Sequence, residues 1–126
     1  MRIEHIYRPE PLICRPEDDL GKAARIMRNT DVGTLAVCEE GRLDRLVGII
    51  SERDLVQAVA DAADLRTRHV RAYTSTGAYT ADLAWDSWTV GNRMLNLGIR
   101  HIPITSKGTV VGMISMRDLV AAEALA

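Results

Sequence analysis

The sequence is poor in aromatic residues and balanced in charge. It contains no phenylalanine, and aromatic residues make up 4% of its 126 positions, which argues against the stacking platforms that bind single-stranded nucleic acid. The formal net charge is −1, so no overall basic field attracts nucleic acid. No apolar run reaches the roughly 18 residues of a membrane-spanning helix, and the N-terminus lacks an apolar signal core. The sequence therefore predicts neither a nucleic-acid nor a membrane partner, and a cytoplasmic location.

The motifs of the common enzyme classes are also missing. The sequence shows no nucleophile paired with a base, no cluster with metal-ligand spacing and no GxxxxGK loop, so we expect no enzyme activity, no metal site and no catalytic cofactor. Cys14 and Cys38 stand apart in apolar surroundings and form no CxxC motif. They are predicted to be buried thiols, with a disulfide or metal role as the alternative. His5 and His69 are interpreted as surface residues.

One nonapeptide occurs twice in the chain. Residues 48–56 read GIISERDLV and residues 112–120 read GMISMRDLV, so the two copies differ at only two positions. A repeat of this length in a short chain indicates a tandem duplication. In each copy an apolar run leads into a serine, and an aspartate follows three residues later. This pattern predicts a buried strand that runs into a capped helix.

The polar residues of the nonapeptide have two interpretations. The serine and the aspartate need do no more than cap the helix. Alternatively, the helix N-terminus, the serine hydroxyl and the adjacent arginine suit a phosphate, and the aspartate can accept two hydrogen bonds from a diol such as a ribose. A cap does not need the arginine, so its recurrence favours a binding role. The residues concerned are Ser51, Arg53 and Asp54 in the first copy and Ser115, Arg117 and Asp118 in the second.

The pattern around the nonapeptides predicts the element order β, α, β, β, α in each half. Strands are expected at 12–14, 34–37 and 46–50, and helices with an apolar stripe of Leu20, Ala23, Ala24 and Met27 and after Ser51. The second half aligns with the first, with Asp86 on Asp19, Met94 on Met27 and Ile104 on Val37. The first half carries a short insertion in the turn around residues 40–45. The polar residues 61–72 are interpreted as a helix end and a connection.

The predicted fold class is therefore α+β, with two βαββα repeats. Repeat 1 is expected over residues 1–63, a connection over 64–72 and repeat 2 over 73–126. A half of about 60 residues buries little apolar surface alone, so the repeats are expected to pack through their sheets as a pseudo-two-fold pair.

A βαββα unit that occurs twice, ends in GhhSxxD and carries a strand such as GIRHIPI at 98–104 closely resembles the cystathionine-β-synthase (CBS) domain. A tandem pair of these domains is a Bateman module. The resemblance covers essentially the whole chain, and a stand-alone module is expected. It implies two clefts that bind adenosine-containing regulatory ligands, such as AMP, ADP, ATP or S-adenosylmethionine.

The resemblance also implies that each cleft combines the signature of one repeat with strands of the other. The signature would hold phosphate and ribose, and the strands would enclose the adenine. Carried over by position, one cleft contains Ser115, Arg117 and Asp118 with Tyr7, Leu12, Val32, Gly33 and Thr34, and the other contains Ser51, Arg53 and Asp54 with Thr74, Tyr79, Ile99, Arg100 and His101.

The two implied clefts differ in charge. Arg100 and His101 stand where repeat 1 has Gly33 and Thr34. The cleft with Asp54 would therefore gain cationic groups that meet a polyphosphate or crowd the base. For Trp85 and Trp88, core or interface packing is the more common role and ligand stacking is the alternative.

The expected function is a regulatory module that senses an adenosine-containing ligand and conveys its level to an effector protein. The alternative is a ligand-free structural or dimerisation module that holds a partner. The segments 55–63 and 119–126 are rich in alanine and leucine. An apolar helix face that one small domain cannot bury favours a homodimer, with core packing as the alternative.

Overall fold

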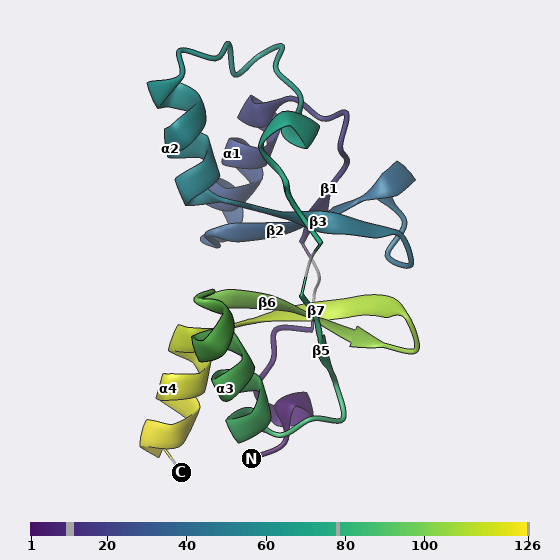
Figure 1. The fold of residues 1–126 in the computed structure, drawn as a ribbon, viewed down its shortest axis with the longest axis vertical. Helices are drawn as coiled ribbons and strands as arrows, with labels where there is room; N and C mark the ends of the chain where they lie inside the picture. The colour runs from purple at the N-terminus through teal and green to yellow at the C-terminus, as the bar shows by residue number, and fades with distance from the viewer. Residues whose placement is uncertain (10–11, 78, 126) are drawn as a thin grey trace. The chain divides into compact units, whose positions relative to one another are not determined.

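The computed structural model of the chain describes residues 1–9, 12–77 and 79–125. These residues form two compact units, each built from a small sheet and two α-helices (Figure 1). Unit 1 consists of Met1–Pro11 together with Tyr79–Ala126, and unit 2 consists of Leu12–Ala78. Within the predicted repeats, Glu10, Pro11, Ala78 and Ala126 lie outside the described residues.

Unit 2 holds the first repeat. Its sheet has the strand order β1-β2-β3-β4, in which β1 and β2 are parallel and the other neighbours are antiparallel. The predicted order β, α, β, β, α is confirmed, and a further short strand follows it. The elements are β1 (Ile13–Cys14), α1 (Leu20–Thr30), β2 (Thr34–Cys38), β3 (Leu46–Ser51), α2 (Glu52–Ala60) and β4 (Ser75–Thr76).

Unit 1 holds the second repeat with the same topology. Its sheet has the order β5-β6-β7, with β5 parallel to β6 and β6 antiparallel to β7. The duplication and the α+β class are therefore confirmed. The elements are the 3₁₀ helix η1 (Ile3–His5), β5 (Ala81–Asp82), α3 (Ser87–Leu97), β6 (His101–Ser106), β7 (Thr109–Ser115) and α4 (Met116–Leu125).

The hairpin connections differ in length, as the repeat alignment predicts. The connection from β2 to β3 includes the 3₁₀ helix η2 (Glu39–Gly41), whereas only Lys107 and Gly108 separate β6 from β7. The insertion around residues 40–45 is confirmed.

Caps define the first helix of each repeat. The carboxylate of Asp19 accepts a hydrogen bond from the N–H of Lys22 at 2.8 Å, and Asp86 caps α3 in the same way. Gly98 ends α3 in the left-handed conformation, with φ at 67°. The strand expected over 98–104 therefore begins only at His101, and the prediction is wrong for its first three residues. The apolar stripe of α1 is confirmed, with Leu20, Ala23 and Met27 buried.

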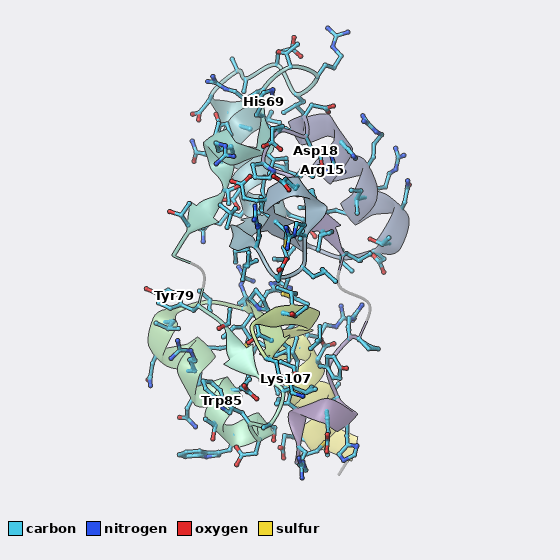
Figure 2. All side chains as sticks on the ribbon, turned by 90° about the vertical axis from the view of Figure 1, so that its right-hand side faces the viewer. Arg15, Asp18, His69, Tyr79, Trp85 and Lys107 are labelled. Carbon is cyan, nitrogen blue, oxygen red and sulfur yellow. The ribbon has the colours of Figure 1, made fainter. Side chains whose placement is uncertain are left out.

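The segment after α2 belongs to the body of unit 2. It contains the 3₁₀ helix η3 (Val70–Tyr73), and Val70 is fully buried. The N–H of Leu20 donates to the carbonyl of Arg68 at 3.0 Å, and the N–H of Val70 donates to the carbonyl of Asp18 at 2.8 Å. At the same turn the carboxylate of Asp18 accepts from the N–H of Arg15 at 2.8 Å (Figure 2). The interpretation of residues 61–72 as a helix end and a connection therefore omits their packing within unit 2.

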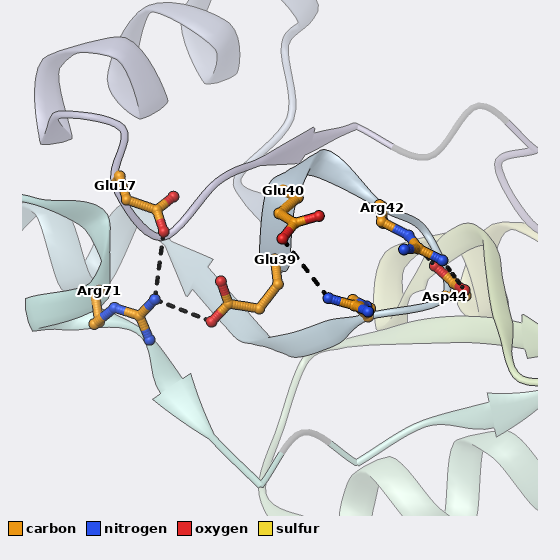
Figure 3. A network of polar contacts seen from close by, with 7 residues as sticks. Glu17, Glu39, Glu40, Arg42, Asp44 and Arg71 are labelled. Carbon is orange, nitrogen blue, oxygen red and sulfur yellow. Dashed lines mark hydrogen bonds and ion pairs between the residues drawn. The ribbon is translucent and has the colours of Figure 1, made fainter.

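Ion pairs link η3 to two neighbouring turns of unit 2 (Figure 3). A guanidinium nitrogen of Arg71 lies 3.0 Å from a carboxylate oxygen of Glu39 and 3.5 Å from one of Glu17. The hydrogen bond that Arg71 donates to Glu39, with the negative charge of both carboxylates, raises the pKa of Arg71. These side chains are exposed, so they orient the turns and contribute little to stability.

Each sheet is extended by the segment that precedes the other repeat. β4 comes directly before the elements of repeat 2, yet it pairs with β3, with Ser75 opposite Ile49. In unit 1 the segment before β1 takes the matching place, because Arg8 forms an antiparallel bridge with Met113 of β7. We call residues 7–9 and 74–76 the leading segments. Because each leading segment packs with the other repeat, the bounds of the compact units differ from those of the sequence repeats. The expected bounds of the repeats stay a prediction.

The leading segments pass close to one glycine in each nonapeptide. A Cβ on Gly48 would clash with the carbonyl of Ser75 and lie 2.9 Å from Cγ2 of Thr74. A Cβ on Gly112 would clash with the carbonyl of Arg8 and lie 2.6 Å from the ring of Tyr7. Only glycine fits at these two positions.

Gly112→Ala should destabilise unit 1 by about 1–3 kcal/mol, because the added methyl group meets backbone atoms that cannot rotate away. Gly91→Ala is the control, since a Cβ there lies 3.6 Å from Leu119 in ordinary contact. This helix-interior change should stabilise the protein by about 0.5–1 kcal/mol. Urea unfolding of both variants measures the difference, and equal effects would contradict the close approach.

Neither thiol should react with Ellman's reagent in the native protein at pH 8. Both cysteines are buried and free. Burial, with a smaller contribution from Asp18, raises the pKa of Cys14 from 9.0 to about 12. Because the pKa is higher in the folded state, the protonated thiol favours the folded protein. This contribution is fully present below pH 9.0, the pKa of the unfolded thiol, and is lost as the pH rises through about 12. Both thiols should react once guanidinium unfolds the chain, and fast native labelling would contradict the burial.

Candidate functional site

In each repeat the signature, GhhSxxD, joins a strand to the following helix. In repeat 1, Ser51 ends β3 and caps α2. Its N–H and its hydroxyl donate to Oδ2 of Asp54 at 2.8 and 3.0 Å, and the N–H of Asp54 donates to the serine oxygen at 3.4 Å. The predicted capping box is confirmed. Oδ1 of Asp54 has no hydrogen-bond partner within the described part of the chain, so it remains available to a ligand.

Repeat 2 forms the same reciprocal pair at the start of α4. The N–H of Ser115 donates to Oδ2 of Asp118 at 2.9 Å, and the N–H of Asp118 donates to the serine oxygen at 3.0 Å. The second carboxylate oxygen differs between the repeats, because Oδ1 of Asp118 lies 3.5 Å from a guanidinium nitrogen of Arg8. The Asp118 side chain is 17% exposed and that of Arg8 59% exposed. An arginine at the surface therefore lies against a largely buried carboxylate.

The leading segments bring different residues to the two signatures. Arg8 is held by two backbone hydrogen bonds with Met113, at 3.0 and 3.2 Å. Ser75 has the corresponding place in unit 2, opposite Ile49 of β3. The sequence prediction named Tyr7 and Thr74 in these segments and missed Arg8. No signal within the repeat marks Arg8, because the repeat alignment pairs it with Ser75.

The first residue of the signature helix also differs between the repeats. It is Glu52 in α2 and Met116 in α4. The N–H of Glu52 donates to the carbonyl of Gly33 at 2.9 Å, and that of Met116 to the carbonyl of Arg100 at 2.8 Å. Residues 33 and 100 therefore lie at the N-terminus of the helix in their own unit. Glu52 is exposed, whereas Met116 packs against the core of unit 1.

One further predicted residue lies across from each signature serine. Thr34 of β2 pairs with Ser51, and His101 of β6 pairs with Ser115. Thr34 is 4% exposed, and its hydroxyl is buried with no hydrogen-bond partner in the part of the chain that the structure describes. A buried hydroxyl without a partner is unfavourable. A polar ligand atom would satisfy it.

The comparison with protein families identifies both repeats. The sequence model of the CBS domain matches residues 3–61 and 70–125. The chain belongs to the CBS domain family. CBS domain proteins are generally regulatory, non-catalytic modules, and no catalytic family is indicated. The predicted tandem CBS pair is therefore confirmed.

Relatives of the chain occur in archaea and plants. An uncharacterized 17.7 kDa protein of Acidianus ambivalens is 30% identical over 128 residues, which cover 96% of this chain and 72% of the relative. The mitochondrial CBS domain-containing protein CBSX3 of Arabidopsis thaliana is 30% identical over 120 residues, which cover 88% of this chain and 55% of the relative. The chain thus spans just over half the length of the plant protein.

Solved CBS structures share the fold over the whole chain. The CBS domain protein PAE2072 from Pyrobaculum aerophilum, complexed with AMP, has a TM-score of 0.87 at 22% identity and covers 100% of both chains. The CBS domain pair of protein MJ0100, in complex with 5′-methylthioadenosine and S-adenosyl-L-methionine, has a TM-score of 0.88 at 20% identity, over 98% of this chain and 96% of that one. At these identities the likeness shows the CBS pair fold.

The residues implied by the CBS resemblance are distributed over both compact units. Each predicted set draws on both. Within its own unit, each signature lies opposite a residue that the prediction assigned to the other set, Thr34 opposite Ser51 and His101 opposite Ser115, and the composite grouping stays a prediction. Unit 1 holds Tyr7, Tyr79, Ile99, Arg100, His101, Ser115, Arg117 and Asp118, and unit 2 holds Leu12, Val32, Gly33, Thr34, Ser51, Arg53, Asp54 and Thr74.

The two tryptophans of the second CBS repeat have different roles. Trp85 packs against the core of unit 1, which confirms core packing for this residue. The guanidinium carbon of Arg93 lies 5.8 Å from the centroids of both the Trp85 and Tyr79 rings (Figure 2). These are cation–π contacts. Trp88 is 76% exposed, so it is not part of the core.

The groups at the CBS signatures are suited to binding. Carboxylates, hydroxyls, arginines and helix N-termini supply the acceptors, donors and positive charge that a phosphorylated diol requires. Residues 1–9, 12–77 and 79–125 contain no group of three or more acidic, histidine or cysteine side chains placed to hold a metal ion. No helix in the same residues is long and apolar enough to cross a membrane.

Proposed function

We propose that this chain is a regulatory module that binds an adenosine-containing ligand at its two signatures and does not catalyse a reaction. The observation that carries the proposal is the serine, arginine and aspartate at the start of both α2 and α4. The cap uses one oxygen of Asp54 and leaves the other to accept from a ribose. Arg53 and Arg117 are exposed beside helix N-termini, where a phosphate is favoured.

The related structures support an adenosine ligand. AMP is bound to the Pyrobaculum protein, and 5′-methylthioadenosine and S-adenosyl-L-methionine are bound to MJ0100. AMP, ADP, ATP and S-adenosylmethionine are therefore the proposed regulatory ligands of this chain. The strand residues named in the two composite sets are proposed to contact the base. An effector protein that binds the liganded state more tightly would read the ligand level.

A second proposal is that the chain forms a homodimer. Among the described side chains, five large apolar ones on the helices are more than three-fifths exposed, and a second copy would cover them. This observation also favours the alternative function, a dimerisation and interaction module with empty ligand sites. The residues are Val56 at 68% and Val59 at 63% on α2, Trp88 at 76% and Leu95 at 70% on α3, and Val120 at 62% on α4.

Saturating ligand should raise the thermal midpoint of the purified protein, because a ligand that binds only the native state stabilises it by mass action. At a concentration of 100 times Kd the gain is about 2.7 kcal/mol, or several degrees. Millimolar AMP, ADP, ATP, S-adenosylmethionine and NADH are tested by differential scanning fluorimetry. In the Asp54→Ala and Asp118→Ala variants, the ligand should raise the thermal midpoint by less, because each variant lacks binding at its own signature.

Asp19→Ala is the matched control for these variants. Asp19 caps α1 outside the signatures, so all three substitutions should cost about 1 kcal/mol without ligand. Only the two signature variants should lose the ligand response. If no ligand shifts the midpoint of the folded wild-type protein, the adenosine proposal is rejected in favour of the interaction module.

Trp88→Glu should convert the homodimer to a monomer, because a carboxylate would be buried at the covered apolar face. Light scattering after size exclusion should give twice 13.9 kDa for the wild type and 13.9 kDa for the variant. Asn96→Glu is the control on the same helix, at an exposed polar position. A monomeric wild type at micromolar concentration would rule out the dimer.

A further inference from the structure

The two signatures share their serine, arginine and aspartate but differ at neighbouring positions, three of which change the formal charge. Two of the differences add a cation around Asp118, and the third removes a carboxylate. The formal charge of the two surroundings therefore differs by three. The neighbours of Asp118 are Arg8, Arg100 and Met116, and the corresponding neighbours of Asp54 are Ser75, Gly33 and Glu52.

These differing residues lie at the signatures themselves. Arg8 is within 3.5 Å of the carboxylate oxygen of Asp118 that the cap does not use. The carbonyl of Arg100 accepts from the first N–H of α4 at 2.8 Å, so residue 100 lies at the positive end of that helix. Arg117 follows in the first turn of the same helix. Within unit 1, Arg8 therefore contacts the Asp118 carboxylate directly, and Arg100 and Arg117 lie at the N-terminus of the same helix.

We propose that the repeat-2 signature selects adenosine ligands that carry a phosphate, and that Arg8 determines this selectivity. The repeat-1 signature accepts nucleosides without a phosphate. The inference deepens the proposed function and rests on it. No bond is made or broken, since the effect is one of binding alone.

The selectivity follows from competition for Asp118. A ribose that binds Oδ1 must displace the guanidinium of Arg8. A phosphate on the same ligand gives that guanidinium a new anionic partner, and Arg–phosphate pairs are strong and often bidentate. A nucleoside without phosphate offers none, so Arg8 continues to compete with its ribose. Among the described residues of unit 2, no cation contacts Oδ1 of Asp54, and Glu52 at the start of the same helix repels a phosphate.

The test compares AMP with adenosine by isothermal titration calorimetry on the full chain. Asp54→Ala restricts binding to the repeat-2 signature, and Asp118→Ala restricts it to the repeat-1 signature. With Asp54→Ala, AMP should bind at least about tenfold more tightly than adenosine, as expected for a charge-assisted pair. With Asp118→Ala, AMP should bind no more tightly than adenosine. Higher salt should reduce the AMP preference, because Arg8 is exposed.

Arg8→Ser, which introduces the residue found at position 75, should abolish the AMP preference in the Asp54→Ala background. Arg2→Ser is the matched control, because it removes the same charge from the same segment while Arg2 pairs with Glu4 at 2.9 Å. The reciprocal change Ser75→Arg should create an AMP preference in the Asp118→Ala background. Thermal unfolding without ligand verifies that each variant is folded.

The outcomes separate this inference from the proposed function. If AMP and adenosine bind but Arg8→Ser and Arg2→Ser leave the same affinity ratio, the role of Arg8 is overturned and the regulatory module stands. An equal affinity for both probes in the Asp54→Ala background has the same meaning. If the wild type binds neither probe nor any other adenosine ligand, the proposed function is overturned and this inference with it.

Discussion

The close approach of a leading segment to a signature glycine is the constraint on which the two sites depend. β4 pairs with β3 over Gly48, and the backbone of Arg8 pairs with Met113 beside Gly112. A side chain on either glycine would keep the segments apart. Because the backbones meet in a defined register, the side chain at residue 8 lies beside the carboxylate of Asp118. Backbone packing thus determines which side chain meets which signature.

The capping box uses one oxygen of the signature aspartate and leaves the other for the proposed ligand contact. Oδ2 of Asp54 holds the N–H and hydroxyl of Ser51, and that arrangement starts α2. The second oxygen does not take part in the cap. Helix formation therefore orients the carboxylate before any ligand arrives, which lowers the entropy lost on binding. The same fact explains why a serine and an aspartate alone are weak evidence for binding, since a helix start requires them in either case.

Local sequence patterns were sufficient to predict most of the fold. The serine and aspartate at Ser51 predict a helix start, apolar spacing identifies the buried stripe of α1, and the duplicated nonapeptide identifies the strand–helix junctions. The errors fall where long-range contacts override local pattern. The polar segment that ends in η3 contributes one fully buried side chain, Val70, and its attachment uses backbone hydrogen bonds that carry no sequence signal. Gly98 was placed in a strand, although a left-handed glycine ends the preceding helix.

The candidate site could be predicted only as far as the repeat itself extends. The serine and aspartate could be found because the duplication repeats them. Arg8 could not, because its contact with Asp118 joins residues that are far apart in the chain and its repeat partner is a serine.

Duplication followed by divergence at positions outside the cap explains how one scaffold can carry two unlike sites. The cap requires the serine and the aspartate, so changing either one weakens the helix as well as the site. Residues 8 and 75, in contrast, enter from the leading segments, where only their backbones are needed for the sheet. Their side chains can change in charge at little cost to the fold. The residues that select ligands by charge are therefore expected at positions that do not determine the fold. They lie beside the serine and aspartate, which serve both the helix cap and the proposed site.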